Sequence, residues 1–297
     1  MDRSRTIVGM GEALFDVFPE ETRLGGAPLN VALHAHQLGN RGIVVSRIGQ
    51  DRLGDQVLEA LHRREMPDDH VQSDPDHPTG TVLVDFDAEG QPTYEIVEDV
   101  AWDYLQWDGD LDHLAGHCDA VCFGTLAQRV AQTRTNIYRF VEQARRAIRL
   151  FDVNLRQTYF DRRQISHSLD IANAVKLNLD ELATIADLFA LPSDSAECAA
   201  ALIGRHELKW IALTRGAEGT VVYTPDGTWH EAEVPPAGDA GDAVGAGDAC
   251  SAALLHGAIR RWPWPRTVAL ANAVASHVAS QKGACPELTE ELLKLAE

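Results

Sequence analysis

The most constraining feature of this 297-residue chain is the glycine-rich segment Gly241-Asp242-Ala243-Val244-Gly245-Ala246-Gly247-Asp248. An alanine-rich apolar stretch follows it, from Ala249 to Ile259, and predicts a buried helix with the glycine loop at its N-terminus. The first turn of a helix offers free backbone N–H groups and the positive end of the helix dipole. Glycine lets an anion approach these groups closely, so the segment predicts an anion-binding loop.

Asp248 ends this segment and places a carboxylate inside the predicted anion site. A second negative charge is a poor structural choice there. The carboxylate is well placed, however, to take a proton from a hydroxyl group that attacks a phosphate held by the same loop. The alternative is a glycine-rich turn in which the aspartate caps the helix. We therefore expect Asp248 to act as a general base in phosphoryl transfer.

The chain is strongly acidic, with 45 Asp and Glu against 26 Lys and Arg and a net charge of −19. This balance argues against a surface that binds nucleic acid. The N-terminus has no apolar leader and no apolar run is long enough to span a bilayer, so we expect a cytoplasmic protein without a membrane partner. The five cysteines lack metal-type spacing and are expected to be reduced core thiols.

Apolar strand-like runs alternate with stretches of helical period along the chain. The predicted strands are Thr6–Met10, Gly42–Ile48, Ala120–Phe123, Leu150–Val153, Ala174–Leu177 and Trp210–Thr214. The predicted helices are Pro28–Leu38, Asp55–Arg64, Thr133–Arg149, Leu179–Phe189, Ser195–His206 and Thr267–Ser280. This order predicts an α/β fold with a mostly parallel sheet and helices on both faces.

Two segments depart from this rhythm. Residues 81–86 and 93–97 alternate with the two-residue period of a strand and are joined by Asp87-Ala88-Glu89-Gly90, which predicts an antiparallel hairpin. Together with the extended segment 13–18 it can form a small sheet that projects beside a cleft as a lid. The alternative is an edge hairpin without a role. Because no linker or repeat interrupts the chain, residues 1–297 are expected to form one domain with lid segments 13–18 and 81–97.

A second glycine pair lies near the N-terminus, in Gly25-Gly26-Ala27-Pro28-Leu29-Asn30. Proline is favoured in the first turn of a helix, so a helix is expected to begin here. Asn30 offers both an acceptor and donors to a polyol. Upstream, Asp16 follows a predicted strand and can accept hydrogen bonds from sugar hydroxyls. Each of these features alone is compatible with a structural role.

Taken together, these motifs resemble the ribokinase-like family of carbohydrate kinases over nearly the whole chain. The two main signatures are Gly25–Ala32 and Asp242–Ala249. Supporting segments occur in the family's order at Arg47–Gly54, Asp152–Arg156, Asn178–Glu181 and Leu213–Gly219. The resemblance implies a ribokinase-like three-layer α/β sandwich with a small β-sheet lid. Further segments look most like bacterial fructokinases, namely Gly11–Asp16, Pro78–Thr81, Ala101–Asp103 and Phe123–Arg129.

The resemblance also implies roles for individual residues. Asp248 would be the catalytic base, and the N–H groups of Gly245, Ala246 and Gly247 would form an anion hole for the phosphoryl group. The residues implied at the sugar are Asp16, Gly25, Gly26, Asn30, Arg129 and Arg156; for Arg156 an ion pair with a nearby carboxylate is equally plausible. The residues implied at ATP are Asn178, Glu181, Thr214, Gly216, Gly219 and Asn272.

Metal ions follow from the same resemblance. Asn178 and Glu181 would organise Mg²⁺ and the phosphates, with Glu181 reaching the metal through water, because hard oxygen ligands suit that ion. A K⁺ site would involve Asp242, Val244, Val278 and Gly283. The lid sheet of such kinases often pairs with its twin, so a homodimer through the lid is implied as well.

The expected function is therefore ATP-dependent transfer of a phosphoryl group to the hydroxymethyl group of a ketohexose, with D-fructose giving fructose 6-phosphate. The nearest alternatives are 2-keto-3-deoxygluconate kinase and ribokinase. A keto acid needs a cation for its carboxylate, which makes Arg129 and Arg156 the residues to inspect. An alternative of another class is a sugar sensor that has kept the fold and lost the chemistry.

Overall fold

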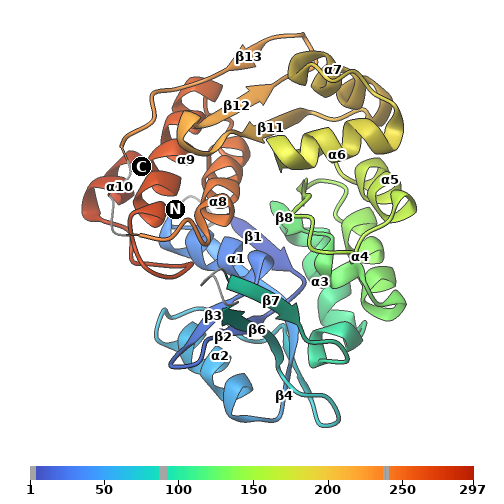
Figure 1. The fold of residues 1–297 in the computed structure, drawn as a ribbon, viewed down its shortest axis with the longest axis vertical. Helices are drawn as coiled ribbons and strands as arrows, with labels where there is room; N and C mark the ends of the chain where they lie inside the picture. The colour runs from blue at the N-terminus through green and yellow to red at the C-terminus, as the bar shows by residue number, and fades with distance from the viewer. Residues whose placement is uncertain (1–4, 87–91, 237, 239–240) are drawn as a thin grey trace.

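The computed structural model describes residues 5–86, 92–236, 238 and 241–297 (Figure 1). Its large sheet contains nine strands in the order β13-β12-β11-β10-β9-β8-β1-β4-β5. From β11 to β5 neighbouring strands pair in parallel, whereas β12 and β13 are antiparallel at one edge. The strand bounds are Thr6–Met10 (β1), Arg41–Gly49 (β4), Val71–Asp74 (β5), Ala120–Phe123 (β8), Ile148–Asp152 (β9), Ala174–Asn178 (β10), Trp210–Thr214 (β11), Thr220–Tyr223 (β12) and Trp229–His230 (β13).

Helices cover both faces of this sheet, which confirms the expected three-layer α/β sandwich (Figure 1). On one face Val8 and Met10 of β1 join a core with α3 (Gly109–His117), α4 (Ala131–Gln143), α5 (Arg162–Ile171), α6 (Leu179–Phe189) and α7 (Ser195–His206). On the other face Ile7 joins a core with α1 (Ala27–Gln37), α8 (Ala246–Ile259), α9 (Trp264–Ala279) and α10 (Glu290–Leu295). Alternate residues of one strand thus serve opposite cores.

The segments predicted to form a lid lie in a separate small sheet with the strand order β3-β2-β6-β7. Its strands are Leu14–Val17 (β2), Thr22–Gly25 (β3), Gly80–Phe86 (β6) and Pro92–Ile96 (β7). β6 and β7 form the expected antiparallel hairpin, and β2 pairs in parallel with β6. The turn predicted at residues 87–90 lies outside the described residues. α2 (Arg52–His62) packs through Val57 and Leu61 in a third core that also contains Phe15 of β2 and Val44 of β4.

Several predicted elements are confirmed to the residue, including β1, β8, β11, α6 and α7. The predicted helix Thr133–Arg149 was wrong at its C-terminal end, because α4 stops at Gln143 and β9 already begins at Ile148. Parallel pairing of Ile148–Asp152 with both β8 and β10 takes these residues into the sheet. Three short helices, α3, α5 and α10, were not predicted. For α5 a signal exists in the capping box formed by Asp161 and Gln164.

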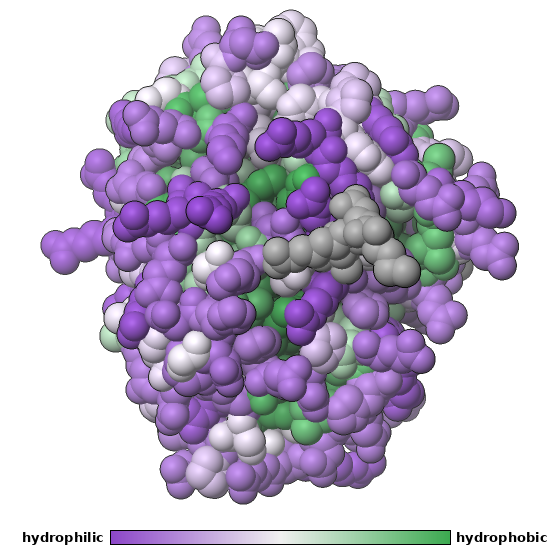
Figure 2. All heavy atoms as spheres, turned by 180° about the vertical axis from the view of Figure 1, so that it is seen from behind, coloured by the Kyte–Doolittle hydropathy of each residue, from purple (hydrophilic) through white to green (hydrophobic). Residues whose placement is uncertain are grey.

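The described surface is largely hydrophilic, as Figure 2 shows for the face opposite that of Figure 1, where hydrophobic areas are separated by polar ones. Within the described ranges no helix is both long and apolar enough to cross a membrane. All five cysteines are free, and four of them are buried, as expected for core thiols; Cys285 is half-buried.

Candidate active site

Ligands of open α/β sheets bind at the carboxyl ends of the strands. Here that edge carries a group of buried polar side chains. Asp152 is the last residue of β9, Lys176 lies near the end of β10, and Glu12 follows β1 by two residues. α8 points its N-terminus at the same edge and brings Asp248 in its first turn. The glycine loop at the N-terminus of α8 and the carboxyl ends of the strands therefore meet at one edge of the sheet.

Gly245 is the N-cap of α8 and has the left-handed backbone conformation, with φ +79°. A Cβ atom at this position would lie 2.3 Å from the carbonyl oxygen of Ala284, so only glycine fits. The Ala246 N–H donates to the Ala243 carbonyl oxygen over 3.3 Å, a long contact that closes the loop. The predicted anion hole is thus a tight turn at a helix N-terminus.

Asp248 is held by Asn30 across the interface between α8 and α1. The Asn30 Nδ2 atom donates to Asp248 Oδ2 over 2.8 Å, and the Asn30 Oδ1 atom accepts from Cys285 Sγ over 3.4 Å. These two contacts fix the amide with its donor toward the carboxylate. Asn30 itself is buried, whereas Asp248 is half-buried. Two residues that the sequence predicted separately are therefore direct partners.

The surroundings of Asp248 raise its pKa to about 6. Burial is the largest cause, and the nearby Asp152 carboxylate adds to it. Lys176, the hydrogen bond from Asn30 and the charge of Arg156 act in the opposite direction. A carboxyl group with this pKa is mostly ionised at neutral pH and basic enough to accept a proton, which suits a general base.

The glycine pair before α1 packs against the chain that leaves β1. Gly26 has φ +111°, and a Cβ atom on it would lie 2.4 Å from the Glu12 carbonyl oxygen. A Cβ on Gly25 would lie 3.3 Å from Asp16 Oδ2. The pair therefore lets the start of α1 approach Asp16 and Glu12 closely, and the three predicted sugar-binding positions Asp16, Gly25 and Gly26 lie together.

Asp16 and Arg156 face the same region. Burial is the main cause that raises the pKa of Asp16, while the charges of Arg156 and Arg23 lower it. Arg156 is exposed, and its charge also lowers the pKa of Glu12 and Asp248. Within the described part of the chain Arg156 forms no ion pair closer than 4.0 Å; its Nη1 atom donates only to the adjacent Leu155 carbonyl oxygen. Its guanidinium group is thus available near three site carboxyls.

Glu12 is a site residue that the sequence reasoning missed. Its side chain is only 3% exposed, and Oε2 has no hydrogen-bond partner among the described residues. Burial, with a smaller contribution from the charge of Asp248, raises its pKa to about 7. The signal that could have found it is its position between Gly11 and β2 of the small sheet, directly after β1.

Arg129, predicted to contact the sugar, has another partner. Its Nε and Nη2 atoms donate to the two Asp103 carboxylate oxygens over 2.8 and 2.7 Å, and its guanidinium lies 4.0 Å from the centre of the Trp102 ring. Nη1 has no partner among the described residues. Arg129 therefore supports the segment that carries Trp102, and both N–H bonds of its Nη1 group remain without a partner among the described residues.

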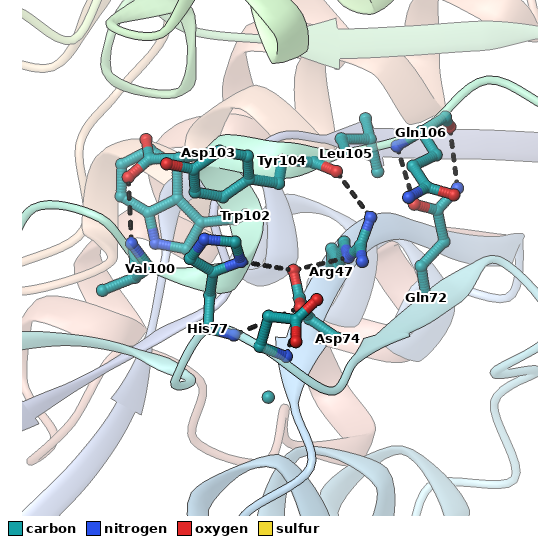
Figure 3. A network of polar contacts seen from close by, with 12 residues as sticks. Arg47, Gln72, Asp74, His77, Val100, Trp102, Asp103, Tyr104, Leu105 and Gln106 are labelled. Carbon is teal, nitrogen blue, oxygen red and sulfur yellow. Dashed lines mark hydrogen bonds and ion pairs between the residues drawn. The ribbon is translucent and has the colours of Figure 1, made fainter.

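Figure 3 shows how this segment is attached to the sheet. Arg47 of β4 contacts Asp74 over 2.9 Å and donates to the Tyr104 carbonyl oxygen over 2.7 Å. His77 binds the same carboxylate over 3.1 Å and stacks on the Tyr104 ring at 3.7 Å. Burial raises the pKa of Asp74, but the hydrogen bonds and Arg47 outweigh it and lower the pKa. The network fixes Trp102 beside Gly80, the first residue of β6 in the small sheet.

The residues predicted at the nucleotide lie at the ends of β10 and β11, where Asn178 and Thr214 are neighbours in register. Asn178 and Glu181 form a capping box: Asn178 Oδ1 accepts from the Glu181 N–H over 2.9 Å, and Glu181 Oε2 accepts from the Asn178 N–H over 2.8 Å. Glu181 Oε1 also accepts from the Leu155 N–H over 3.1 Å. Burial raises the pKa of Glu181.

Gly216 and Gly219 follow β11 and both have positive φ, +59° and +80°. Gly216 is exposed, and a Cβ atom there would meet nothing within 4 Å. Asn272 is buried on α9, where its Oδ1 atom accepts from the Thr220 N–H over 3.0 Å and its Nδ2 atom donates to the Ala232 carbonyl oxygen over 3.1 Å. Its amide thus joins α9 to the antiparallel edge of the sheet.

The residues predicted at a K⁺ ion lie around the loop before α8. Asp242 Oδ2 binds Arg23 of β3, in the small sheet, over 2.9 Å, and Asp242 Oδ1 has no partner among the described residues. Its N–H group donates to the Gln281 carbonyl oxygen, which places it at the end of α9. Val278 is buried there, its carbonyl oxygen accepting from Gln281, whereas Val244 is 48% exposed.

Comparisons with known proteins agree with this architecture. Residues 10–291 match the sequence model described as the pfkB family of carbohydrate kinases. A fructokinase of Salmonella typhimurium is 30% identical over 259 residues, which cover 83% of this chain and 82% of that protein. Solved structures of the same fold include the fructokinase of Xylella fastidiosa with bound ATP (TM-score 0.83, 21% identity, covering 98% of this chain and 97% of that one). They also include the fructokinase of Vibrio cholerae O395 with fructose, ADP and calcium (TM-score 0.80, 24% identity, 99% of both chains).

Proposed function

Because this chain belongs to the pfkB family of carbohydrate kinases, and is therefore a phosphotransferase that acts on a sugar, we propose that it phosphorylates D-fructose with ATP to give fructose 6-phosphate. The observation that carries the proposed mechanism is the position of Asp248. It lies in the first turn of α8, directly after the glycine loop, with its carboxylate held by Asn30 and a pKa of about 6.

In the proposed reaction Asp248 takes the proton of the sugar hydroxymethyl group. The freed oxygen forms a bond to the γ-phosphorus of ATP, and the bond between that phosphorus and the bridging oxygen of ADP breaks. The N–H groups of Gly245, Ala246 and Gly247 stabilise the charge on the transferring phosphoryl group. Losing one such donor typically costs on the order of 10²–10³ in rate.

We propose that the sugar lies between the glycine pair and Asp248. Asp16, half-buried and close to Gly25, accepts hydrogen bonds from sugar hydroxyls, and Asn30 contacts the hydroxyl that reacts. Arg156, which is exposed, faces Asp16 and Asp248 from the solvent side of the proposed sugar site. Arg129 contributes through Trp102 and through its unpaired Nη1 atom. Buried polar groups left unpaired without substrate favour a ligand rich in hydroxyls.

The nucleotide is proposed to bind over the ends of β10 and β11, bordered by Thr214, Gly216 and Gly219, with Asn272 behind them. The donor set fits a Mg²⁺ ion that accompanies ATP: Glu181 keeps lone pairs beyond its two backbone partners, and carboxylates suit this ion directly or through water. Mg²⁺ bound with Asn178 and Glu181 would neutralise charge on the phosphates.

A K⁺ site beside the glycine loop also fits the residues present. The Asp242 Oδ1 atom is buried and has no partner among the described residues. The Asp242 N–H group donates to the Gln281 carbonyl oxygen, which joins the segment of Val244 to the segment of Val278 and Gly283. An ion bound there would hold the loop that leads into α8. We propose that K⁺ activates the enzyme in this way.

The small sheet is proposed to close over the sugar as a lid of one kinase domain that spans residues 1–297. Arg23 of β3 already contacts Asp242 next to the glycine loop, which links the lid to the phosphate site. Leu83 and Tyr94, on β6 and β7, are 42% and 56% exposed. Because large exposed apolar side chains mark interaction surfaces, we propose that two copies pair through this sheet.

One observation favours a second substrate. Arg156 is exposed, has no ion-pair partner in the described residues and lies near Asp16 and Asp248, where it could bind a carboxylate. A 2-keto-3-deoxy sugar acid is therefore the alternative substrate. Ribose lacks a carboxylate, and no contact among the described residues favours ribose over fructose.

The test is ADP release with Mg-ATP and saturating K⁺ over fructose, tagatose, ribose, glucose and 2-keto-3-deoxygluconate. Turnover on fructose supports the full proposal. If the wild type phosphorylates the keto acid and Arg156→Gln does not, the substrate is a sugar acid. If no sugar of the panel leads to ADP release while ATP still binds, the proposed kinase activity is contradicted and a sugar sensor is supported.

A further inference from the structure

Lys176 carries a buried positive charge that the proposed mechanism does not use. It lies near the carboxyl end of β10, opposite Asp152 in the register of β9 and β10. Its Nζ atom is 3.0 and 3.2 Å from the two Asp152 oxygens, and both residues are buried. Ser251 of α8 donates to Asp152 Oδ2 over 2.7 Å. The buried ion pair therefore lies in the sheet, and the hydrogen bond from Ser251 links it to α8.

The ammonium group lies directly behind the proposed anion hole. A Cβ atom built on Gly247 would be 3.0 Å from Lys176 Nζ. The ion pair with Asp152, 3.0 Å from Nζ to Oδ1, favours the charged form of Lys176. Lys176 thus places a positive charge next to the residues that would hold the phosphoryl group and take the proton.

Stability alone does not account for this pair. Desolvation of two charges offsets much of their attraction, and well-packed apolar residues of similar volume are often as stable or more so. An apolar pair would also satisfy the core, since Ala174 and Leu177 of the same strand are buried. The position of the charge behind Gly247 points instead to an electrostatic role at the site.

We propose, on the basis of the proposed function, that Lys176 is a positioning residue whose fixed charge stabilises both the Asp248 carboxylate and the phosphoryl group above Gly247. Asp152 holds the ammonium group from the sheet, and Ser251 of α8 holds Asp152 by donating to its carboxylate. Charge placed in advance where negative charge develops lowers the barrier without reorganisation during the reaction.

The charged and titratable groups around Asp248 come from every element packed near it. They are Glu12 after β1, Cys122 of β8, Asp152 and Arg156 at and after β9, Lys176 of β10, and Cys285 after α9. Asp152 raises the Asp248 pKa, and Lys176 and Arg156 lower it. Removing Lys176 and removing Asp152 must therefore shift the Asp248 pKa in opposite directions.

Three variants test this role: Lys176→Met, Asp152→Leu and the double variant with both changes. In Lys176→Met we expect kcat to fall about tenfold or more, a smaller loss than that of a direct donor, while the KM for sugar changes little. The double variant has no unpaired buried charge, so it is expected to recover stability towards urea but not kcat. A double variant with wild-type kcat would overturn the proposal and leave Lys176 as the structural partner of Asp152.

The Asp248 pKa gives a readout that a structural role does not move. It is followed by NMR titration of the labelled carboxyl carbon in protein without substrates, with Asp248→Asn to assign the signal. We expect a higher pKa in Lys176→Met, a lower one in Asp152→Leu, and wild-type behaviour in Lys176→Arg. Unshifted titrations contradict the inference. The titration needs no enzymatic activity, so it tests the role of Lys176 independently of the proposed function. The proposed function is refuted separately if the wild type does not phosphorylate any sugar.

Discussion

Replacing Gly26 by alanine tests the proposed sugar site through its backbone. The new Cβ atom would lie 2.4 Å from the Glu12 carbonyl oxygen, where ordinary contacts begin at 3.4 Å, so the two chains must separate by about 1 Å. The backbone also has φ +111°, which only glycine adopts readily. Strain and overpacking together predict a loss of roughly 2–6 kcal/mol in the free energy of unfolding.

Gly39 provides the matched control at the other end of α1. It has φ +79°, but a Cβ atom there meets nothing within 4 Å, so Gly39→Ala should cost only about 1–2 kcal/mol of backbone strain. Urea denaturation of both variants measures this difference, and steady-state kinetics of the folded fraction measure the KM for sugar. We expect KM to rise only in Gly26→Ala. Equal losses of stability with an unchanged KM would refute the reasoning.

Further predictions concern pH, an N-cap and the cation. Because Asp248 must be ionised to act as a base and has a pKa of about 6, turnover should fall as pH drops through 6; a rate that stays flat down to pH 5 contradicts this assignment. The Glu12→Gln variant shows which part of this fall in turnover belongs to Asp248, because it removes the titration of Glu12, whose pKa is about 7. Asp51→Asn should cost about 2 kcal/mol in urea denaturation, since the carboxylate accepts from Gly54 N and from both Thr79 N and Oγ1 over 2.8 Å; an unchanged midpoint counts against it. Burial raises the pKa of Asp51, but these bonds outweigh it and lower the pKa, so its contribution to stability is present above the unfolded pKa near 4 and is lost as pH falls through the folded value. Asp242→Ala should abolish any activation by K⁺; equal turnover of the wild type in K⁺ and in a bulky organic cation would exclude such a site.

The local patterns of the chain predicted most of the strands and helices, because apolar periodicity and glycine positions depend on near neighbours, but they did not predict β3, β5, β12, β13, α3, α5 and α10. They also predicted Asn30 and Asp248 one at a time. The contact between them arises because α1 packs along α8, an arrangement of segments more than 200 residues apart that no local pattern contains.

The buried charged residues could not be predicted from the sequence. Lys176 and Asp152 lie within or next to predicted strands, where a single charged residue is indistinguishable from one that faces solvent. Only the register of β9 and β10 makes them a pair. For Arg129, its place in a fructokinase-like motif predicted a ligand contact. The ion pair that it forms with Asp103 was not predicted, because it joins two segments that are 26 residues apart in the sequence.

The most direct test of the central claim is transfer of the labelled γ-phosphoryl group of ATP to D-fructose by the wild type and by Asp248→Asn. Binding of ATP and of fructose to both proteins is measured by calorimetry in parallel. The account predicts labelled fructose 6-phosphate from the wild type, transfer reduced to background in Asp248→Asn, and similar binding to both. Undiminished transfer by Asp248→Asn would contradict the assignment of Asp248 as the general base.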